Sequence, residues 1–304
     1  MPTRPGPVLC LGSFDGVHLG HRAILDRARA IAERTGGPVA VLTYSPLPAQ
    51  VIHPDFSYIL TPLEEKTALL VELGVERVHV VRFDLGVRDT APGRFIETEI
   101  LPLHPSAVVA GHDHRFGRNG EGDVELLRRE LEPQGIEVVA VDEFVLFDAP
   151  VRSTRVREKL LLGHVTRAAE LLGRPYRLEG PVVSGTRTGR QLGFPTINLL
   201  IEEREKLVPA DGVYAVLVDI DSELYPGVLN IGHRPTFRGE TRTIEAHLFD
   251  RELDRTPDRA AALFVERLRP ERRFRSPEDL AHQIAADVGR ARELLARQSL
   301  RAKP

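Results

Sequence analysis

The chain has 304 residues, of which 42% are hydrophobic and 28% are charged, and its formal net charge is -3 at pH 7. This length favours two domains over one compact core, and the charge balance gives no reason to expect nucleic acid or a membrane as a partner. No uninterrupted apolar stretch is long enough to span a bilayer. The single cysteine, Cys10, excludes an intrachain disulfide and favours a cytoplasmic location.

The first half alternates short apolar strands with helical patterns. Strands are predicted over 7–14, 37–44, 77–83, 106–111 and 136–144, and helices over 18–34, 62–73, 92–101 and 122–132. The helix at 62–73 has Thr61 as its predicted N-cap. This alternation predicts an α/β domain with a doubly wound parallel sheet, in which sites lie beyond the carboxyl ends of the strands.

The pattern changes after about residue 173. Strands are predicted over 176–184, 213–220, 224–231, 242–249 and 261–268, with a final helix over 276–297. Closely spaced strands followed by one amphipathic helix predict a small antiparallel β-barrel with a C-terminal helix. Two short helical stretches, 154–162 and 165–173, bridge the halves, so we expect domains at 1–173 and 174–304.

The stretch GSFDGVHLGH, residues 12–21, follows the first predicted strand. A glycine-bounded turn leading into a helix offers backbone N–H groups and the positive end of the helix dipole to a phosphate. His18 and His21 are three residues apart, so they share one face of the first helical turn. Solvated or capping histidines are the alternative interpretation of this motif.

A second cradle for phosphate is predicted in PVRSTRVREKL, residues 150–160, by hydroxyl and guanidinium groups at the start of a helix. Its candidate residues are Ser153, Thr154, Arg155 and Arg157. An ordinary N-cap is the alternative interpretation for the serine and threonine.

Together these two motifs resemble the signatures of the nucleotidyltransferase superfamily, whose fold is Rossmann-like. With GHDHRFGRNGEGD (111–123), they resemble the FMN adenylyltransferase half of bacterial riboflavin kinase/FAD synthetases. The resemblance implies that His18 and His21 stabilise the ATP phosphates. The other ATP-binding residues that it implies are Gly12, Phe14, Asp15, Ser153, Thr154, Arg155 and Arg157.

The same resemblance places Asp113, Phe116 and Gly117 in a flavin-binding loop, although Asp113 is equally well interpreted as a turn aspartate. The chain departs from the family pattern at three positions. These are Arg152 in place of a serine, His114 in place of an aromatic residue, and Leu47 in place of a histidine.

In the second half, SGTRTGRQLGFPTINL (184–199) is rich in glycine and arginine but contains no GK[ST], which argues against a P-loop kinase. Thr196 and Asn198 are two residues apart, and on an extended chain they point to one face, as metal and phosphate ligands should. These neutral groups suit Mg²⁺ that arrives with ATP.

The segment RTIEAHLFD (242–250) contains a candidate general base. Glu245 alternates with Ile244 and Ala246, so it projects to the opposite face from these apolar neighbours and could accept a proton from a hydroxyl. An exposed strand glutamate is the alternative. His247 shares the face of Glu245 and is interpreted as a structural partner.

GFPTIN, GVLNIGHRPTF (227–237) and RTIEAHLFD resemble, in this order, the riboflavin kinase domain. The resemblance implies that Thr196 and Asn198 bind Mg–ATP and that Glu245 deprotonates the ribityl 5′-hydroxyl. Further ATP-binding residues that it implies are Gly185, Gly189 and Arg190.

The resemblance over residues 7–297 implies a bifunctional enzyme that converts riboflavin to FMN and FMN to FAD, with ATP as co-substrate and Mg²⁺ as cofactor. One alternative is a riboflavin kinase whose first half has impaired or altered transfer activity. Another is a flavin-binding regulator without turnover. The sequence carries no signal for an oligomeric state.

Overall fold

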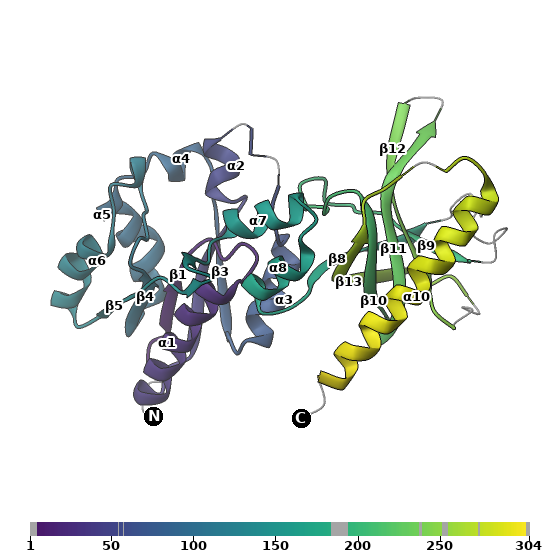
Figure 1. Cartoon of the computed structure of the whole chain (residues 1–304). Helices are drawn as coiled ribbons and strands as arrows, with labels where there is room; N and C mark the ends of the chain where they lie inside the picture. Colours follow the sequence, from purple (N-terminus) through teal and green to yellow (C-terminus); the bar gives the residue numbers. More distant parts are fainter. Residues whose placement is uncertain are drawn as a thin grey trace. The chain divides into compact units, whose positions relative to one another are not determined.

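The computed structural model describes residues 5–53, 55–56, 58–183, 194–236, 239–250, 255–272 and 274–301. The chain forms two compact units, residues 1–153 and 154–304 (Figure 1). None of the helices in the described part of the chain combines the length and the apolarity that crossing a bilayer requires.

The first unit is built on a five-stranded parallel sheet with the strand order β3-β2-β1-β4-β5 (Figure 1). Its strands are β1 (Val8–Leu11), β2 (Val39–Ser45), β3 (Arg77–Arg82), β4 (Ala107–Gly111) and β5 (Glu137–Val141). The central strand β1 pairs with β2 on one side and with β4 on the other. The direction of winding reverses between β1 and β4, and in such sheets ligands bind at the carboxyl ends of the two strands that flank this point.

Helices cover both faces of this sheet, which confirms the predicted doubly wound fold. They are α1 (Leu19–Thr35), α2 (Pro48–Ile52), α3 (Leu63–Glu72), α4 (Leu85–Arg88), α5 (Pro92–Phe95) and α6 (Val124–Leu131). Successive residues of β1 point to opposite faces, so Cys10 packs with Leu25 of α1 while Leu9 packs with Leu127 of α6. All four residues of β1 are therefore buried, as in a sheet covered on both sides.

The predicted bounds differ from the observed ones where loops carry the site. The first strand ends at Leu11 rather than at Phe14, so most of the motif lies in a turn. The helix predicted at 92–101 is α5 followed by a π-helical turn at Ile96–Ile100 and a 3₁₀ turn at Leu101–Leu103. Helix α2 and the short hairpin of β6 (Val145–Leu146) and β7 (Ala149–Pro150) were not predicted.

The second unit contains a closed barrel with the strand order β10-β11-β12-β9-β8-β13. Its strands are β8 (Tyr176–Val183), β9 (Thr196–Leu199), β10 (Gly212–Ile220), β11 (Glu223–Thr236), β12 (Gly239–Leu248) and β13 (Arg259–Arg269). Every strand pairing in the barrel is antiparallel, which confirms the predicted barrel. The fully buried Tyr214 and Phe264 meet edge to face, with 5.1 Å between ring centroids.

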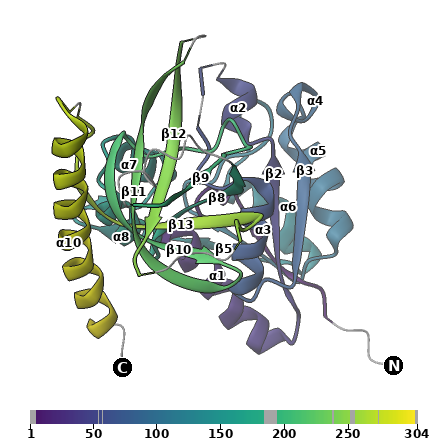
Figure 2. The same ribbon diagram turned by 90° about the vertical axis from the view of Figure 1, so that its right-hand side faces the viewer.

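The helices of this unit are α7 (Ser153–Leu161), α8 (Val165–Leu172) and α10 (Pro277–Arg301). The predicted C-terminal helix is thus present, and Figure 2 shows it along the outside of the barrel. Ala291 and Leu295 of α10 pack against Val213 of β10. Helix α8 packs on β13, where the Thr166 hydroxyl donates a hydrogen bond of 3.0 Å to the Val265 carbonyl.

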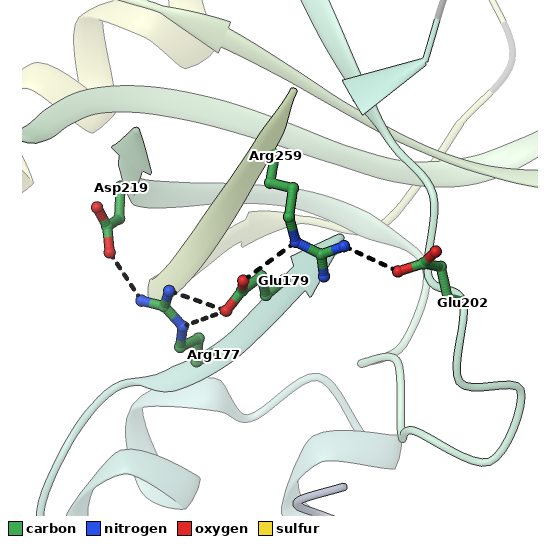
Figure 3. Close-up of polar contacts among 5 residues, drawn as sticks. All are labelled: Arg177, Glu179, Glu202, Asp219 and Arg259. Atoms are coloured by element: carbon green, nitrogen blue, oxygen red, sulfur yellow. Dashed lines mark hydrogen bonds and ion pairs between the residues drawn. The ribbon is translucent and has the colours of Figure 1, made fainter. Parts of the chain in front are cut away.

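A network of ion pairs joins several strands of the barrel (Figure 3). The guanidinium of Arg177 on β8 lies 2.9 Å from Asp219 of β10 and 3.0 Å from Glu179 of its own strand. Arg259 of β13 joins Glu179 to Glu202, a residue that follows β9. The network therefore links four parts of the barrel wall through partly exposed side chains.

Candidate active sites

The turn after β1 has a backbone conformation that most residues avoid. The φ angles of Phe14, Gly16 and Val17 are +51°, +84° and +41°. A positive φ is strained for phenylalanine and above all for a β-branched valine. Phe14 and Val17 are fully buried, so their packing holds the strained backbone in place.

A buried carboxylate ties this turn to a segment 45 residues later in the chain. Asp15, with 2% of its surface exposed, accepts hydrogen bonds from the Leu60 and Thr61 backbone N–H groups at 2.9 and 3.0 Å. The Thr61 hydroxyl in turn accepts the Gly16 N–H at 2.9 Å. The predicted role of Thr61 as the N-cap of the next helix is wrong, because Pro62 occupies that position and Thr61 caps the motif turn instead.

The two histidines of the motif stack at the start of α1. Their ring centroids are 3.7 Å apart at an interplanar angle of 18°. His18 is the N-cap of α1, and its Nδ1 accepts the His21 backbone N–H at 3.4 Å. In the neutral ring this leaves Nε2 of His18 as the nitrogen that carries the proton and can donate to a phosphate.

Little room is left for a side chain at Gly20, between these histidines. A Cβ at Gly20 would lie 3.0 Å from the Val151 carbonyl oxygen and 3.2 Å from the His18 ring. Close to this contact, the Ser153 hydroxyl donates to the Asp15 carbonyl at 2.8 Å. Ser153, the last residue of the first compact unit, therefore lies at the motif turn. The predicted site residues that follow it, Thr154, Arg155 and Arg157, belong to the second compact unit.

The predicted flavin loop follows β4 and is anchored to the core. Phe116 is buried and packs with Phe95, with 5.6 Å between ring centroids. Gly117 has a φ of +71°, and a Cβ there would lie 2.9 Å from the Cα of Pro92. The Asp113 carboxylate lies 3.1 Å from the Arg152 guanidinium, which also contacts Glu143. Arg152 thus pairs with one of the predicted flavin-binding residues.

The structure also shows the surroundings of His114 and Leu47, the other two departures from the family pattern. His114 lies beside Phe116, with 5.9 Å between ring centroids, and burial lowers its pKa to about 4 against the opposing effect of Asp113. Its Nε2 is buried and has no hydrogen-bond partner among the described residues. Leu47 is buried at the N-cap position of α2, where its N–H donates to the Gln50 side chain at 2.7 Å.

In the barrel, strand register brings the predicted kinase residues together. Asn198 of β9 lies directly opposite Glu245 of β12, and Thr196 lies opposite His247. Directly opposed residues of antiparallel strands share a face of the sheet. The intervening Ala246 is fully buried on the other face. The four polar side chains therefore form two adjacent rows on one face.

A third residue, Asn230, belongs to the row of Asn198 and Glu245 and was not predicted from the sequence. Asn230 of β11 lies opposite Glu245 on the side away from Asn198, so an amide flanks this carboxylate on each neighbouring strand. The signal in the sequence was the polar asparagine between the apolar residues of GVLNIG, but its partner strand was not predictable. His247 holds the start of β9, because its Nδ1 lies 2.9 Å from the Pro195 carbonyl oxygen.

The glycine- and arginine-rich loop before β9 was predicted to bind ATP. Its residues Gly185, Gly189 and Arg190 lie outside the part of the chain that the structure describes, which resumes at residue 194. Within that described part, no cluster of three or more histidine, cysteine or acidic side chains could hold a metal ion. The neutral oxygens of Thr196 and Asn198 fit Mg²⁺ whose remaining ligands are ATP phosphates and water.

Comparison with known families assigns each half to a class of enzyme. A model of FAD synthetase matches residues 2–155, and a model of riboflavin kinase matches residues 172–295. Kinases and adenylyltransferases use ATP, so both halves belong to ATP-dependent transferase classes.

Several relatives match along nearly the whole chain. The bifunctional riboflavin kinase/FMN adenylyltransferase of Listeria monocytogenes is 35% identical, covering 95% of this chain and 93% of the relative. That of Pseudomonas fluorescens is 38% identical, covering 97% and 95%. A crystal structure described as a macrolide-efflux protein from Streptococcus pneumoniae is 31% identical, with a TM-score of 0.86 and 94% of each chain covered. The chain belongs to the bifunctional riboflavin kinase/FMN adenylyltransferase family, as the resemblance of its motifs implied.

Proposed function

We propose that this chain makes FAD from riboflavin in two ATP-dependent steps. The second half transfers the γ-phosphoryl group of ATP to riboflavin, which yields FMN and ADP. The first half transfers the adenylyl group of a second ATP to FMN, which yields FAD and pyrophosphate. The observation that carries this proposal is that one chain holds both site arrangements, the stacked His18–His21 pair and the Asn198–Glu245 cross-strand pair.

In the kinase step, Glu245 acts as the general base. Its carboxylate accepts the proton of the ribityl 5′-hydroxyl while the hydroxyl oxygen attacks the γ-phosphorus and ADP leaves. Thr196 and Asn198 would hold Mg²⁺ together with the ATP phosphates, and the bound ion neutralises charge on these phosphates. The neighbouring amide of Asn230 orients the carboxylate from the other side. Gly185, Gly189 and Arg190 are proposed to contact the same ATP.

In the adenylyl-transfer step, a phosphate oxygen of FMN attacks the α-phosphorus of ATP, and pyrophosphate leaves. The attacking phosphate is already ionised, so the step depends on alignment and charge stabilisation rather than on a base. His18 and His21 donate hydrogen bonds to the phosphates, beside backbone groups of Gly12, Phe14 and Asp15.

Two further groups of residues complete this proposed site. Thr154, Arg155 and Arg157 bind the departing phosphates, while Ser153 orients the start of their helix. Asp113, Phe116 and Gly117 form the flavin side. Because Phe116 is buried in the core, its contribution is to hold the loop, whereas the exposed carboxylate of Asp113, which pairs with Arg152 through Oδ2, contacts FMN.

For the two activities we propose the boundaries 1–173 and 174–304. Residues of α7 serve the first activity under this assignment, although α7 from Thr154 onward and α8 belong to the second compact unit, in which α8 packs on β8 and β13. A cytoplasmic location is also proposed, on the support of the single buried cysteine, Cys10.

The test is to incubate the full chain with ATP, Mg²⁺ and either riboflavin or FMN, and to separate the flavins by chromatography. We expect FMN and FAD from riboflavin, and FAD from FMN. FMN without FAD from either substrate would favour the alternative in which Arg152, His114 and Leu47 have altered the first half. Absence of both products would overturn the proposal.

A further inference from the structure

A lysine is buried directly behind the motif turn. Lys66 of α3 has 2% of its surface exposed, and its ammonium group donates to three uncharged oxygens. These are the Ser13 carbonyl at 3.2 Å, the Thr43 hydroxyl at 3.0 Å and the Tyr44 carbonyl at 3.0 Å. Within the described part of the chain, no carboxylate forms an ion pair with this ammonium group.

Packing alone does not explain the charge. Lys66 and Leu70 are the two buried residues of α3, one turn apart, so an apolar side chain at residue 66 would continue the buried face. Burial lowers the pKa of Lys66 to about 8, although the negative charge of Asp15 acts in the opposite direction. The three N–H bonds of an ammonium group match the three acceptors, whereas a neutral amine has only two.

The ammonium group orients one peptide of the motif turn. The Ser13 carbonyl accepts from Lys66 and also from the Thr43 hydroxyl, at 2.9 Å. The Ser13–Phe14 peptide is trans, so its N–H points opposite to its carbonyl and therefore away from Lys66. In the described part of the chain, the Phe14 N–H has no hydrogen-bond acceptor.

We propose that Lys66 is a positioning residue for adenylyl transfer, which holds the Ser13 carbonyl inward and thereby fixes the turn that leads to His18 and His21, the proposed donors to the phosphates of ATP. Lys66 itself does not touch the substrate. This inference rests on the function proposed for the first half. It adds a residue from α3 to the part of the site that the first unit forms at the ends of β1 and β4.

The first test compares Lys66→Met with wild type in the full chain. Methionine is unbranched and of similar volume, although one atom shorter, and it removes the three donors. We expect kcat/KM for ATP in FAD formation to fall roughly 10- to 100-fold, because the loss of a fixed donor at a developing charge has effects of this order or larger, and a loosened turn displaces the donors that follow it. The KM for FMN should stay within about twofold, since the flavin loop is anchored separately through Phe116 and Gly117.

Two controls separate positioning from general loss of structure. Lys159→Met, at a half-buried lysine paired with Glu158, should leave FAD formation unchanged. Thr43→Val removes one of the two donors to the Ser13 carbonyl and keeps Lys66, so it should lower kcat/KM for ATP in the same direction by a smaller factor. Unchanged kinetics in Lys66→Met, or an equal rise of both KM values with a lower unfolding midpoint, would overturn the proposal.

The pH profile gives an independent readout. In wild type, kcat/KM for ATP should fall as the pH rises above about 8, because deprotonated Lys66 lacks one donor. The other titratable groups that act on this environment are Asp15 from the turn and Tyr44 from β2, whose hydroxyl pKa is raised well above this range by burial. In Lys66→Met, kcat/KM for ATP should be lower than in wild type and should not fall as the pH rises above about 8. A fall of the same size in the variant would contradict the proposal.

Hydrogen exchange at the Phe14 amide tests the role of Lys66 without any need for FAD formation. In wild type, adding Mg–ATP should slow exchange at this amide, and in Lys66→Met the protection should be lost. If wild type forms no FAD at all, the proposed function fails. The exchange measurement still decides the role of Lys66: protection only in wild type supports it, and equal exchange in both proteins overturns it.

Discussion

The two units place their polar site residues by opposite means. In the first unit the site follows β1 as an irregular turn with strained backbone at Phe14 and Val17. Contacts from distant parts of the chain hold that turn, through Thr61 and the buried side chains of Asp15 and Lys66. The geometry of the turn therefore depends on hydrogen bonds to segments that are distant in the sequence.

In the barrel, the ladder of regular strands sets the geometry. Glu245 lies between Asn198 and Asn230 because three antiparallel strands share one register, and Ala246 anchors the opposite face in the core. A substitution on the polar face can then remove a functional group without moving the backbone. In the turn, by contrast, replacing a motif residue can also move the backbone. A change in activity is therefore a less direct measure of a side chain's role in the turn than on the barrel strands.

The largest effect is expected for Glu245→Gln, which keeps the shape of the side chain and removes the base. FMN formation should fall roughly 10²- to 10⁴-fold, the usual range for a general base. FAD formation from supplied FMN should not change. Glu266→Gln, at a half-buried glutamate of β13, is the matched control. Kinase turnover within threefold of wild type would show that Glu245 is an ordinary strand glutamate.

The next largest effect is expected for His21→Asn in the turn. Loss of a positioned donor to the phosphates should lower FAD formation roughly 10²- to 10³-fold, with FMN formation from riboflavin retained. His79→Asn on β3 is the control for removing a half-buried histidine from the same unit. Chromatography of the flavins gives both rates from one preparation. An unchanged rate of FAD formation would show that His18 and His21 only cap the start of α1.

The alternation of strands and helices in the sequence was sufficient to predict both folds, because burial on two faces and on one face leaves different periodicities. It also placed Thr196, Asn198 and Glu245 on one side of their strands, since side-chain direction in a strand depends only on the parity of the position. The relative register of the strands, which adds Asn230, is a tertiary property that no single segment contains.

The turn was less predictable for the same physical reason. Thr61 was predicted to cap a helix, yet the structure joins its backbone N–H to the carboxylate of Asp15. Lys66 could have been singled out as a charge on the apolar face of α3 and as one of four lysines in the chain. The acceptors of its ammonium group lie on other strands and turns, so the sequence could not identify them.

A smaller effect is expected on the stability of the first unit, from His114 beside Phe116 in the predicted flavin loop. The folded-state pKa of His114 is about 4 and the ordinary value is 6.5, so below pH 6.5 the unfolded chain binds a proton that the folded chain does not. Stability is therefore lost as the pH falls from 6.5 towards 4, by about 2 kcal/mol at pH 5.

His114→Phe restores the aromatic residue of the family pattern and should remove this loss. Urea unfolding at pH 8, 7, 6 and 5 should show that the variant gains relative to wild type only below about pH 6.5. Its FAD formation at pH 7.5 tests at the same time whether His114 alters adenylyl transfer. A constant difference in unfolding free energy at all four pH values would contradict the assignment of a buried neutral imidazole.

The smallest effect is expected in the ion-pair network of the barrel (Figure 3). If strand pairing holds the barrel, Arg177→Met should lower the free energy of unfolding by less than about 1 kcal/mol, because the exposed fractions of 32% for Arg177 and 43% for Glu179 allow solvent to screen the charges. FMN formation should be unchanged. The control is Arg255→Met, whose guanidinium lies 3.8 Å from Asp221 with both side chains largely exposed. A loss of several kcal/mol together with weaker kinase activity would mean that distant polar contacts hold the barrel site as they hold the turn, and the contrast between the two units would fail.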